Sequence, residues 1–143
     1  MIFFENFETR VALWSDFRKS LEIDSDPLQK VINFWNDAPI SALSCDPFDQ
    51  STWLNPWNLI EDNHYCEFSK ILAIYYTLVL TDRFKNNYFE IQIINDREAH
   101  ELKYILIVDD FIIGYFYNRP IHQEDLPLDI SVQMSYPMLK DFS

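Results

Sequence analysis

One cysteine, one histidine and a set of polar residues follow one another in the order that nucleophilic thiol catalysis requires. Cys66 stands where a long apolar stretch begins, and the N-terminal end of a helix lowers the pKa of a thiol and stabilises its thiolate. His100 lies just before a predicted strand and could act as general base. Asp109, Asp110 and Asn118 lie where a residue that orients the base is expected. We name Cys66, His100 and Asp110 as candidate catalytic residues of a small thiol hydrolase or acyltransferase.

Other interpretations of the same residues stay open at this point. A cysteine in the first turn of a buried helix is commonly a small packed side chain. His64 and Cys66 have a spacing that zinc ligands can use, but no second pair of close ligands follows, and we predict no metal and no cofactor. Cys45 and Cys66 do not make a disulfide framework, which indicates free thiols in a reducing cytoplasm.

Aromatic residues gather in and just after an aperiodic connection, residues 36–55. Phe48, Trp53 and Trp57 could form a surface that docks a protein partner, because aromatic side chains dominate the energetics of interfaces. The same three rings could instead pin the connection to the core. Long ordered loops in compact domains are often functional.

Composition excludes several classes of function. The formal net charge of −12 disfavours binding to nucleic acid, because an acidic surface repels phosphate. The only glycine is Gly114, which rules out glycine-rich phosphate loops. The uncharged centre of the long apolar stretch, Ile71–Leu80, is too short to cross a bilayer, and we predict no membrane partner. Glu5 and Glu8 interrupt the N-terminus before a secretory signal could form.

The spacing of apolar residues predicts the elements that would position these candidates. A three/four spacing predicts helices over residues 3–21 and from Pro27 to about residue 38, with a short helical turn at 56–62. Tyr65–Phe84 reads as one long central helix. Alternation with period two then predicts strands at 88–94, 102–108, 111–117 and 129–136, with a hairpin at Asp109-Asp110. We therefore predict one α+β domain over residues 1–143, with N-terminal helices and the long helix packed on an antiparallel meander of three to four strands.

The order of Cys66 on a helix, a strand, and the hairpin KYILIVDDFIIGYF resembles the core of transglutaminase-like and papain-like thiol enzymes over roughly residues 63–118. In that family a histidine stands at the start of the strand, where this chain has Lys103 or Tyr104. The family's acidic residue belongs near residues 113–115, where this chain has none. The resemblance therefore implies a scaffold whose catalytic site has been lost.

The phrasing FWNDAPISALSCDPFDQSTW and PWNLIEDNHYCEFSKILAIYYTL is also similar to small proteins of contractile-tailed phages that infect marine bacteria. This resemblance implies a non-enzymatic structural or assembly protein, located in the virion after assembly in the host cytoplasm. Its partners would be other virion proteins at a head, neck or tail junction. The thiol enzyme is the alternative prediction, and a phage-encoded inhibitor of a host protein is the second alternative.

Overall fold

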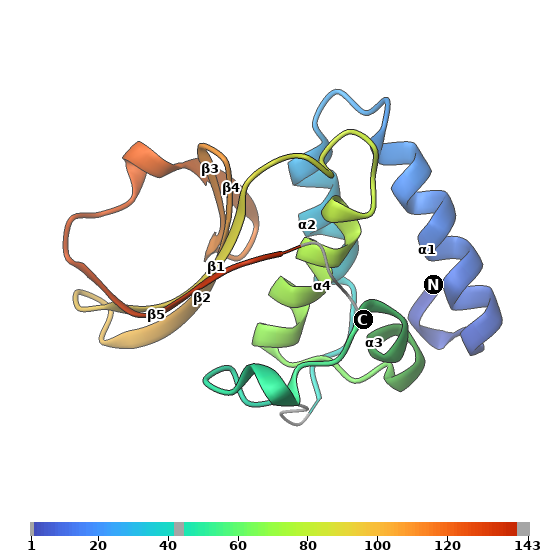
Figure 1. Cartoon of the computed structure of the whole chain (residues 1–143), viewed down its shortest axis with the longest axis horizontal. Coiled ribbons are helices and arrows are strands. Elements are labelled where there is room, and N and C mark those ends of the chain that lie inside the picture. The colour runs from blue at the N-terminus through green and yellow to red at the C-terminus, as the bar shows by residue number, and fades with distance from the viewer. Residues whose placement is uncertain (1, 42–44, 140–143) are drawn as a thin grey trace.

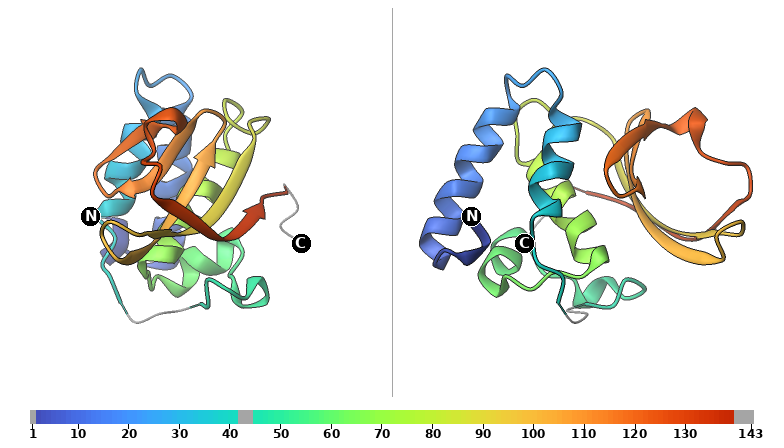
Figure 2. Two further views of the ribbon diagram at one scale, coloured as in Figure 1. Left: turned by 90° about the vertical axis from the view of Figure 1, so that its left-hand side faces the viewer. Right: turned by 180° about the vertical axis from the view of Figure 1, so that it is seen from behind.

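A computed structural model describes residues 2–41 and 45–139 of the chain. Helices come first and a sheet second, which confirms the predicted α+β class. The molecule is layered, with α1 outermost, α2 and α4 in the middle, and the sheet on the far side of α4 (Figures 1 and 2). The helical elements are η1 (Ile2–Phe4), α1 (Phe7–Leu21), α2 (Pro27–Asn36), η2 (Gln50–Thr52), α3 (Pro56–Asp62), α4 (Glu67–Val79) and η3 (Gln123–Asp125).

The starts of the helices follow local capping chemistry. Asn6 and Asn55 each accept a backbone N–H of the first turn of α1 and α3, at 2.9 and 2.8 Å. Pro27 and Pro56 occupy the beginning of α2 and α3, where the missing N–H costs nothing. These short-range signals explain why the sequence predicts the first helices well.

The central helix α4 is shorter than the predicted Tyr65–Phe84. It begins after Cys66 and ends at Val79 because Thr81 competes with the helical pattern. The Thr81 hydroxyl donates to the Leu78 carbonyl at 2.6 Å and accepts the Phe84 N–H at 3.1 Å. Arg83 therefore lies beyond the helix, where its guanidinium donates to carbonyls of Leu21 and Asp24.

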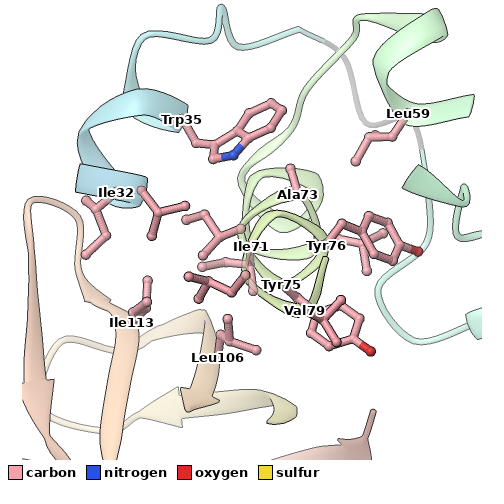
Figure 3. Packing of buried hydrophobic residues seen from close by; sticks show 14 of the residues in the cluster. Ile32, Trp35, Leu59, Ile71, Ala73, Tyr75, Tyr76, Val79, Leu106 and Ile113 are labelled. Atoms are coloured by element: carbon pink, nitrogen blue, oxygen red, sulfur yellow. The ribbon is translucent and has the colours of Figure 1, made fainter. Parts of the chain in front are cut away.

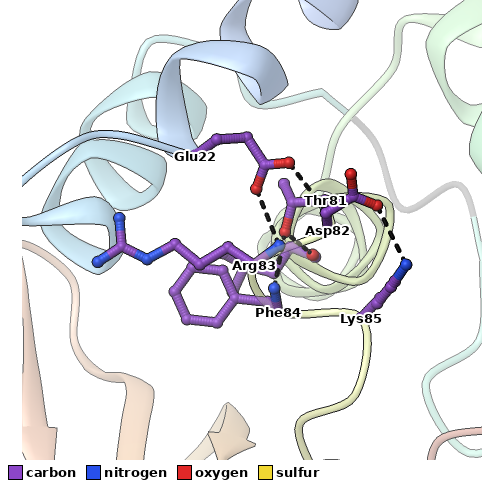
Figure 4. Close-up of polar contacts among 7 residues, drawn as sticks. Glu22, Thr81, Asp82, Arg83, Phe84 and Lys85 are labelled. Carbon is purple, nitrogen blue, oxygen red and sulfur yellow. Dashed lines mark hydrogen bonds and ion pairs between the residues drawn. The ribbon is translucent and has the colours of Figure 1, made fainter.

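The segment after α4 is fastened to the end of α1. The carboxylate of Glu22 accepts the backbone N–H groups of Asp82 and Arg83 at 3.0 and 2.9 Å (Figure 4). Hydrogen bonds to a carboxylate are stronger than neutral ones. The direction in which the chain leaves α4 toward the sheet is thus set by a residue sixty positions earlier.

Packing around α4 makes the main core. All residues from Ile71 to Val79 are buried. Ile32 and Trp35 of α2 cover one side of the helix, and Leu106 and Ile113 of the sheet cover another (Figure 3). Burying an aliphatic or aromatic side chain contributes roughly 1.5–3 kcal/mol, so this helix carries much of the stability.

Within the described residues the sheet has five antiparallel strands, more than the three to four predicted, in the order β4-β3-β2-β1-β5. The strands are β1 (Phe89–Asp96), β2 (Glu101–Val108), β3 (Phe111–Phe116), β4 (Arg119–His122) and β5 (Ile130–Pro137). The predicted hairpin at Asp109-Asp110 joins β2 to β3, and Asp109 adopts φ 48°. β4 was not predicted because it contains Pro120, which cannot donate a backbone hydrogen bond and therefore argues against a strand. Proline is tolerated there because β4 is an edge strand.

The face of the sheet turned away from the helices carries a small core of its own. The sheet curls strongly (Figure 1). Five isoleucines are buried together on the inner side of the curl: Ile94, Ile105, Ile107, Ile112 and Ile121. The sheet is therefore buried on both faces, which explains why the strand pattern of β2 ends in four consecutive buried residues.

Candidate functional site

Cys66 is the N-cap of α4 rather than a residue of its first turn. Its Sγ accepts the backbone N–H of Ser69 at 3.4 Å, and the Ser69 hydroxyl accepts the Cys66 N–H at 2.8 Å. This reciprocal pair is a capping box. We call Cys66–Ser69 the head of α4. The thiol sulfur therefore lies at the N-terminal end of the helix and receives an N–H, and both effects stabilise a thiolate.

The head of α4 is packed into the core. Cys66 is 7% exposed, and Ser69 and Phe68 are fully buried. Tyr65, the residue before Cys66, pairs with Ile40 in an isolated parallel bridge. The backbone that carries the sulfur is thus held by this bridge before Cys66 and by the capping box after it.

Tyr104 of β2 faces the head of α4. Its ring meets that of Phe68 edge-on, with centroids 5.4 Å apart. Burial raises the pKa of the Tyr104 phenol, and negative charge on Cys66 and Glu67 raises it further. The phenol therefore stays protonated at neutral pH and keeps its O–H as a donor. Tyr104 is one of the two residues that stand where the resembled family carries its histidine.

The predicted base and the predicted orienting residue lie at opposite ends of β2. His100 is exposed in the turn before the strand and adopts φ 54°, and Asp110 is exposed in the turn after it. Eight extended residues separate the two turns, a length of about 26 Å. The structure therefore does not bring His100 and Asp110 together with Cys66 as one triad. His64 and His122 are exposed as well.

The three aromatic residues predicted to bind a partner have different surroundings. Trp53 is half-buried, with its ring 4.9 Å from both Phe68 and Tyr136 and its indole N–H donated to the Asp46 carbonyl. Trp57 lies on α3 against Trp14. Phe48 is exposed in the loop before η2. Trp53 thus pins the connection to the core, as the alternative interpretation stated.

A groove opens beside the head of α4, between the helices and the sheet. Its volume is about 660 Å³, and Glu67, Lys70 and Tyr104 belong to its wall. Burial lowers the pKa of the half-buried Lys70 below its ordinary value, against the opposing effect of Glu67 and Asp37. The sequence predicted neither this groove nor the position of Tyr104, since both depend on how β2 and β3 are placed against α2 and α4.

Residues 2–41 and 45–139 carry neither a metal-binding cluster nor a membrane-spanning helix. Those residues contain no group of three or more histidine, cysteine or acidic side chains placed to hold a metal ion. None of the helices in the described parts of the chain has the length and apolarity needed to cross a membrane.

Comparison with solved structures shows the fold. Two structures of LapG from Legionella pneumophila, one of them EGTA-treated, superimpose with a TM-score of 0.58 at 17% sequence identity. The match covers 90% of this chain and 71–73% of the LapG chains. No family model and no curated protein matches the sequence. The chain is thus similar in fold to LapG, a bacterial transglutaminase-like cysteine protease.

This match overturns the leading functional prediction. A non-enzymatic structural protein of the virion was expected, but the fold is shared with a cysteine protease and favours the thiol-enzyme alternative. The order of helix, strand and hairpin over residues 63–118 agrees with this fold, and the structural match extends to 90% of the chain.

Proposed function

We propose that this chain is a small thiol hydrolase or acyltransferase with Cys66 as its nucleophile. The observation that carries the proposal is the place of Cys66 Sγ, at the N-cap of the central helix of a fold shared with a cysteine protease. An N-cap thiolate is stabilised by the helix dipole and by the Ser69 N–H at 3.4 Å.

The chemistry begins with loss of the thiol proton to water. The thiolate of Cys66 then attacks the carbonyl carbon of an acyl substrate, and an S–C bond forms as the carbonyl electrons move to oxygen. When this oxyanion collapses, the bond to the leaving group breaks, and the leaving group takes a proton from water. A water molecule or a second nucleophile finally cleaves the thioester and restores the thiol.

Tyr104 would stabilise the oxyanion. Its raised pKa keeps the phenol protonated, so its O–H can donate to the negative oxygen. A phenol of raised pKa does not remove protons at neutral pH, so Tyr104 replaces the family's histidine in position and not in role. The proposal thus pairs a thiolate that the helix activates with a donor supplied by β2.

The test compares Cys66→Ser with Cys45→Ser. Serine retains the N-cap, so the first variant should fold. With p-nitrophenyl acetate as acyl donor, we expect the wild type and Cys45→Ser to release a burst of p-nitrophenolate equal to the protein concentration. We expect Cys66→Ser to release none. An equal burst from all three proteins would overturn the proposal.

Iodoacetamide labelling provides a second measurement that needs no substrate. In the native protein, from about pH 5 to about pH 10, we expect iodoacetamide to label Cys66, with a rate that rises as the thiolate forms. Mass spectrometry after digestion separates its labelling from that of Cys45, which is also buried. Labelling of Cys66 only after unfolding would contradict nucleophilic catalysis.

A further inference from the structure

The groove beside the head of α4 has an apolar floor and an apolar rim. Ile32 of α2, Ile71 of α4 and Ile113 of β3 point toward one another at its floor (Figure 3). Four side chains of the wall are large, hydrophobic and exposed, at 61, 46, 40 and 82% respectively: Ile40, Leu102, Phe116 and Tyr117. Exposed apolar side chains that gather around a hollow mark interaction sites.

One wall of this groove is the open edge of a strand. β2 pairs with β1 along its whole length, Glu101–Val108, but pairs with β3 only over Leu106–Val108. In the parts of the chain that the structure describes, no strand pairs with the β3 side of residues 101–105. Gly114 of β3 still lies against Tyr104 and Ile105, so the open stretch of this interior strand is Glu101–Lys103.

The backbone of Leu102 faces the groove. A Cβ on Gly114 of β3 would lie 2.4 Å from the Tyr104 carbonyl oxygen, so that carbonyl points to the β3 side. In an antiparallel strand the N–H and C=O of one residue point to the same side, and alternate residues share that side. Leu102 therefore directs its N–H and C=O to the groove, where an added strand could pair with them.

The net charge of the chain favours a basic partner. The groove wall itself carries two acidic and two basic side chains, Glu67, Glu101, Lys70 and Lys103. The Lys103 ammonium lies 3.6 Å from the Asp96 carboxylate and 3.7 Å from that of Glu101, so these three charges are satisfied within the chain. The chain as a whole carries a formal charge of −12, so a basic segment is attracted at long range.

We propose that the groove binds an extended peptide segment as an added strand on β2, with apolar side chains alternating with basic ones. Main-chain hydrogen bonds to Leu102 supply the strand pairing. Alternate side chains enter the apolar floor between the sheet and α4, and the basic side chains between them are held by the negative charge of the chain. The proposal concerns binding alone. It is tested in the Cys66→Ser background, so its failure is independent of whether Cys66 is a nucleophile.

The first experiment uses a fluorescein-labelled heptapeptide of alternating lysine and valine, with binding measured by fluorescence anisotropy. A matched peptide has its central valine replaced by proline, which removes a backbone donor and breaks strand pairing. A third peptide has glutamate in place of every lysine. We expect both controls to bind at least tenfold more weakly. Equal binding of the proline peptide overturns the added strand, and equal binding of the glutamate peptide overturns the basic partner.

The second experiment locates the site. Leu102→Lys places a positive charge on the rim, and Val132→Lys places the same charge on β5, on a side chain of similar exposure (46 and 52%). We expect the first variant to weaken binding of the lysine–valine peptide about tenfold and the second to leave it nearly unchanged. Equal weakening by both variants overturns the site.

A backbone measurement on the unmodified groove completes the test. In a ¹⁵N-labelled Cys66→Ser protein, we expect the Leu102 amide to shift and to become protected from hydrogen exchange as the lysine–valine peptide is added. The Val132 amide is the internal reference. A Leu102 amide that exchanges at the same rate with and without the peptide overturns pairing to β2.

Discussion

The body of α4, Lys70–Val79, and its head, Cys66–Ser69, both bury polar atoms, but they satisfy these atoms in different ways. In the body, the Thr77 hydroxyl accepts the indole N–H groups of Trp14 and Trp35, at 3.0 and 2.9 Å, and donates to the Ala73 carbonyl. One hydroxyl thus joins three helices. At the head, the capping bonds run between two residues that are three positions apart.

This difference separates stability from chemistry along a single helix. The bonds of Thr77 depend on the placement of α1 and α2, and every partner is fully buried. The bonds of the cap depend only on the local turn. We therefore expect the largest loss in the free energy of unfolding from a substitution in the body, with the thiol unaltered. We expect substitutions at the head to cost less stability and to alter the reactivity of the thiol.

Thr77→Val should have the largest effect on stability. Valine has nearly the same shape, but it leaves two buried indole N–H groups without an acceptor, each costing roughly 1–3 kcal/mol. We expect the free energy of unfolding to fall by about 3 kcal/mol in urea denaturation. Below the transition, iodoacetamide should label Cys66 as in the wild type.

The control for this variant is Thr9→Val, a half-buried threonine of α1. Surface threonines without a special role change stability by about 0.5 kcal/mol or less on substitution. If Thr77→Val were no more destabilising than Thr9→Val, the Thr77 hydroxyl would not stabilise the packing of the three helices.

Much of the fold was predictable because it depends on local signals. Asn55 and Pro56 mark the start of α3, and Asp109-Asp110 marks the β2–β3 turn. The end of α4 was not predictable, because an apolar run gives no sign of the competing hydroxyl of Thr81. β4 was hidden by Pro120, whose tolerance there depends on the strand being at an edge.

The candidate site was predictable only in part. The sequence could place Cys66 at a helix start, since capping is local. It could not identify the residue of β2 that faces the thiol, because this depends on how the strand is positioned against α4. His100 was chosen for its residue type, whereas the structure places Tyr104 beside the head of the helix.

Ser69→Ala should have the next largest effect on stability. The substitution removes the acceptor for the buried Cys66 N–H and the donor to the Cys66 carbonyl. Loss of an N-cap interaction costs about 1–2 kcal/mol, less than the change expected for Thr77→Val. In contrast to that variant, the rate of iodoacetamide labelling at Cys66 should rise, because the cap that holds the thiol is loosened. Ser25→Ala, at an exposed turn, is the control, and equal labelling in both variants would contradict a role for the cap.

Ionisation of Tyr75, in the body of α4, should lower the free energy of unfolding at alkaline pH. Burial raises the pKa of its phenol from 10.0 to about 12. Because the folded state holds the proton more tightly than the unfolded state, this contribution is fully present below pH 10 and is lost as the pH rises toward 12.

Tyr75→Phe should therefore be slightly less stable at neutral pH, since it loses the bond to the Leu139 carbonyl, yet lose less stability as the solution becomes alkaline. Thermal unfolding followed across this range measures both effects. Tyr117→Phe is the control because Tyr117 is 82% exposed. A pH dependence identical in Tyr75→Phe and wild type would refute the assignment.

Tyr104→Phe should change stability least and still alter the chemistry at the head. The ring and its edge-on contact with Phe68 are retained, so the free energy of unfolding should change by about 0.5 kcal/mol or less. Loss of one donor to an oxyanion should slow the release of p-nitrophenolate about tenfold, which corresponds to about 1.4 kcal/mol. Tyr88→Phe, on an exposed tyrosine before β1, should leave the rate unchanged. If Tyr104→Phe released p-nitrophenolate at the wild-type rate, Tyr104 would not stabilise the oxyanion. The reactive part of the molecule would then consist of Cys66–Ser69 alone, without a contribution from β2.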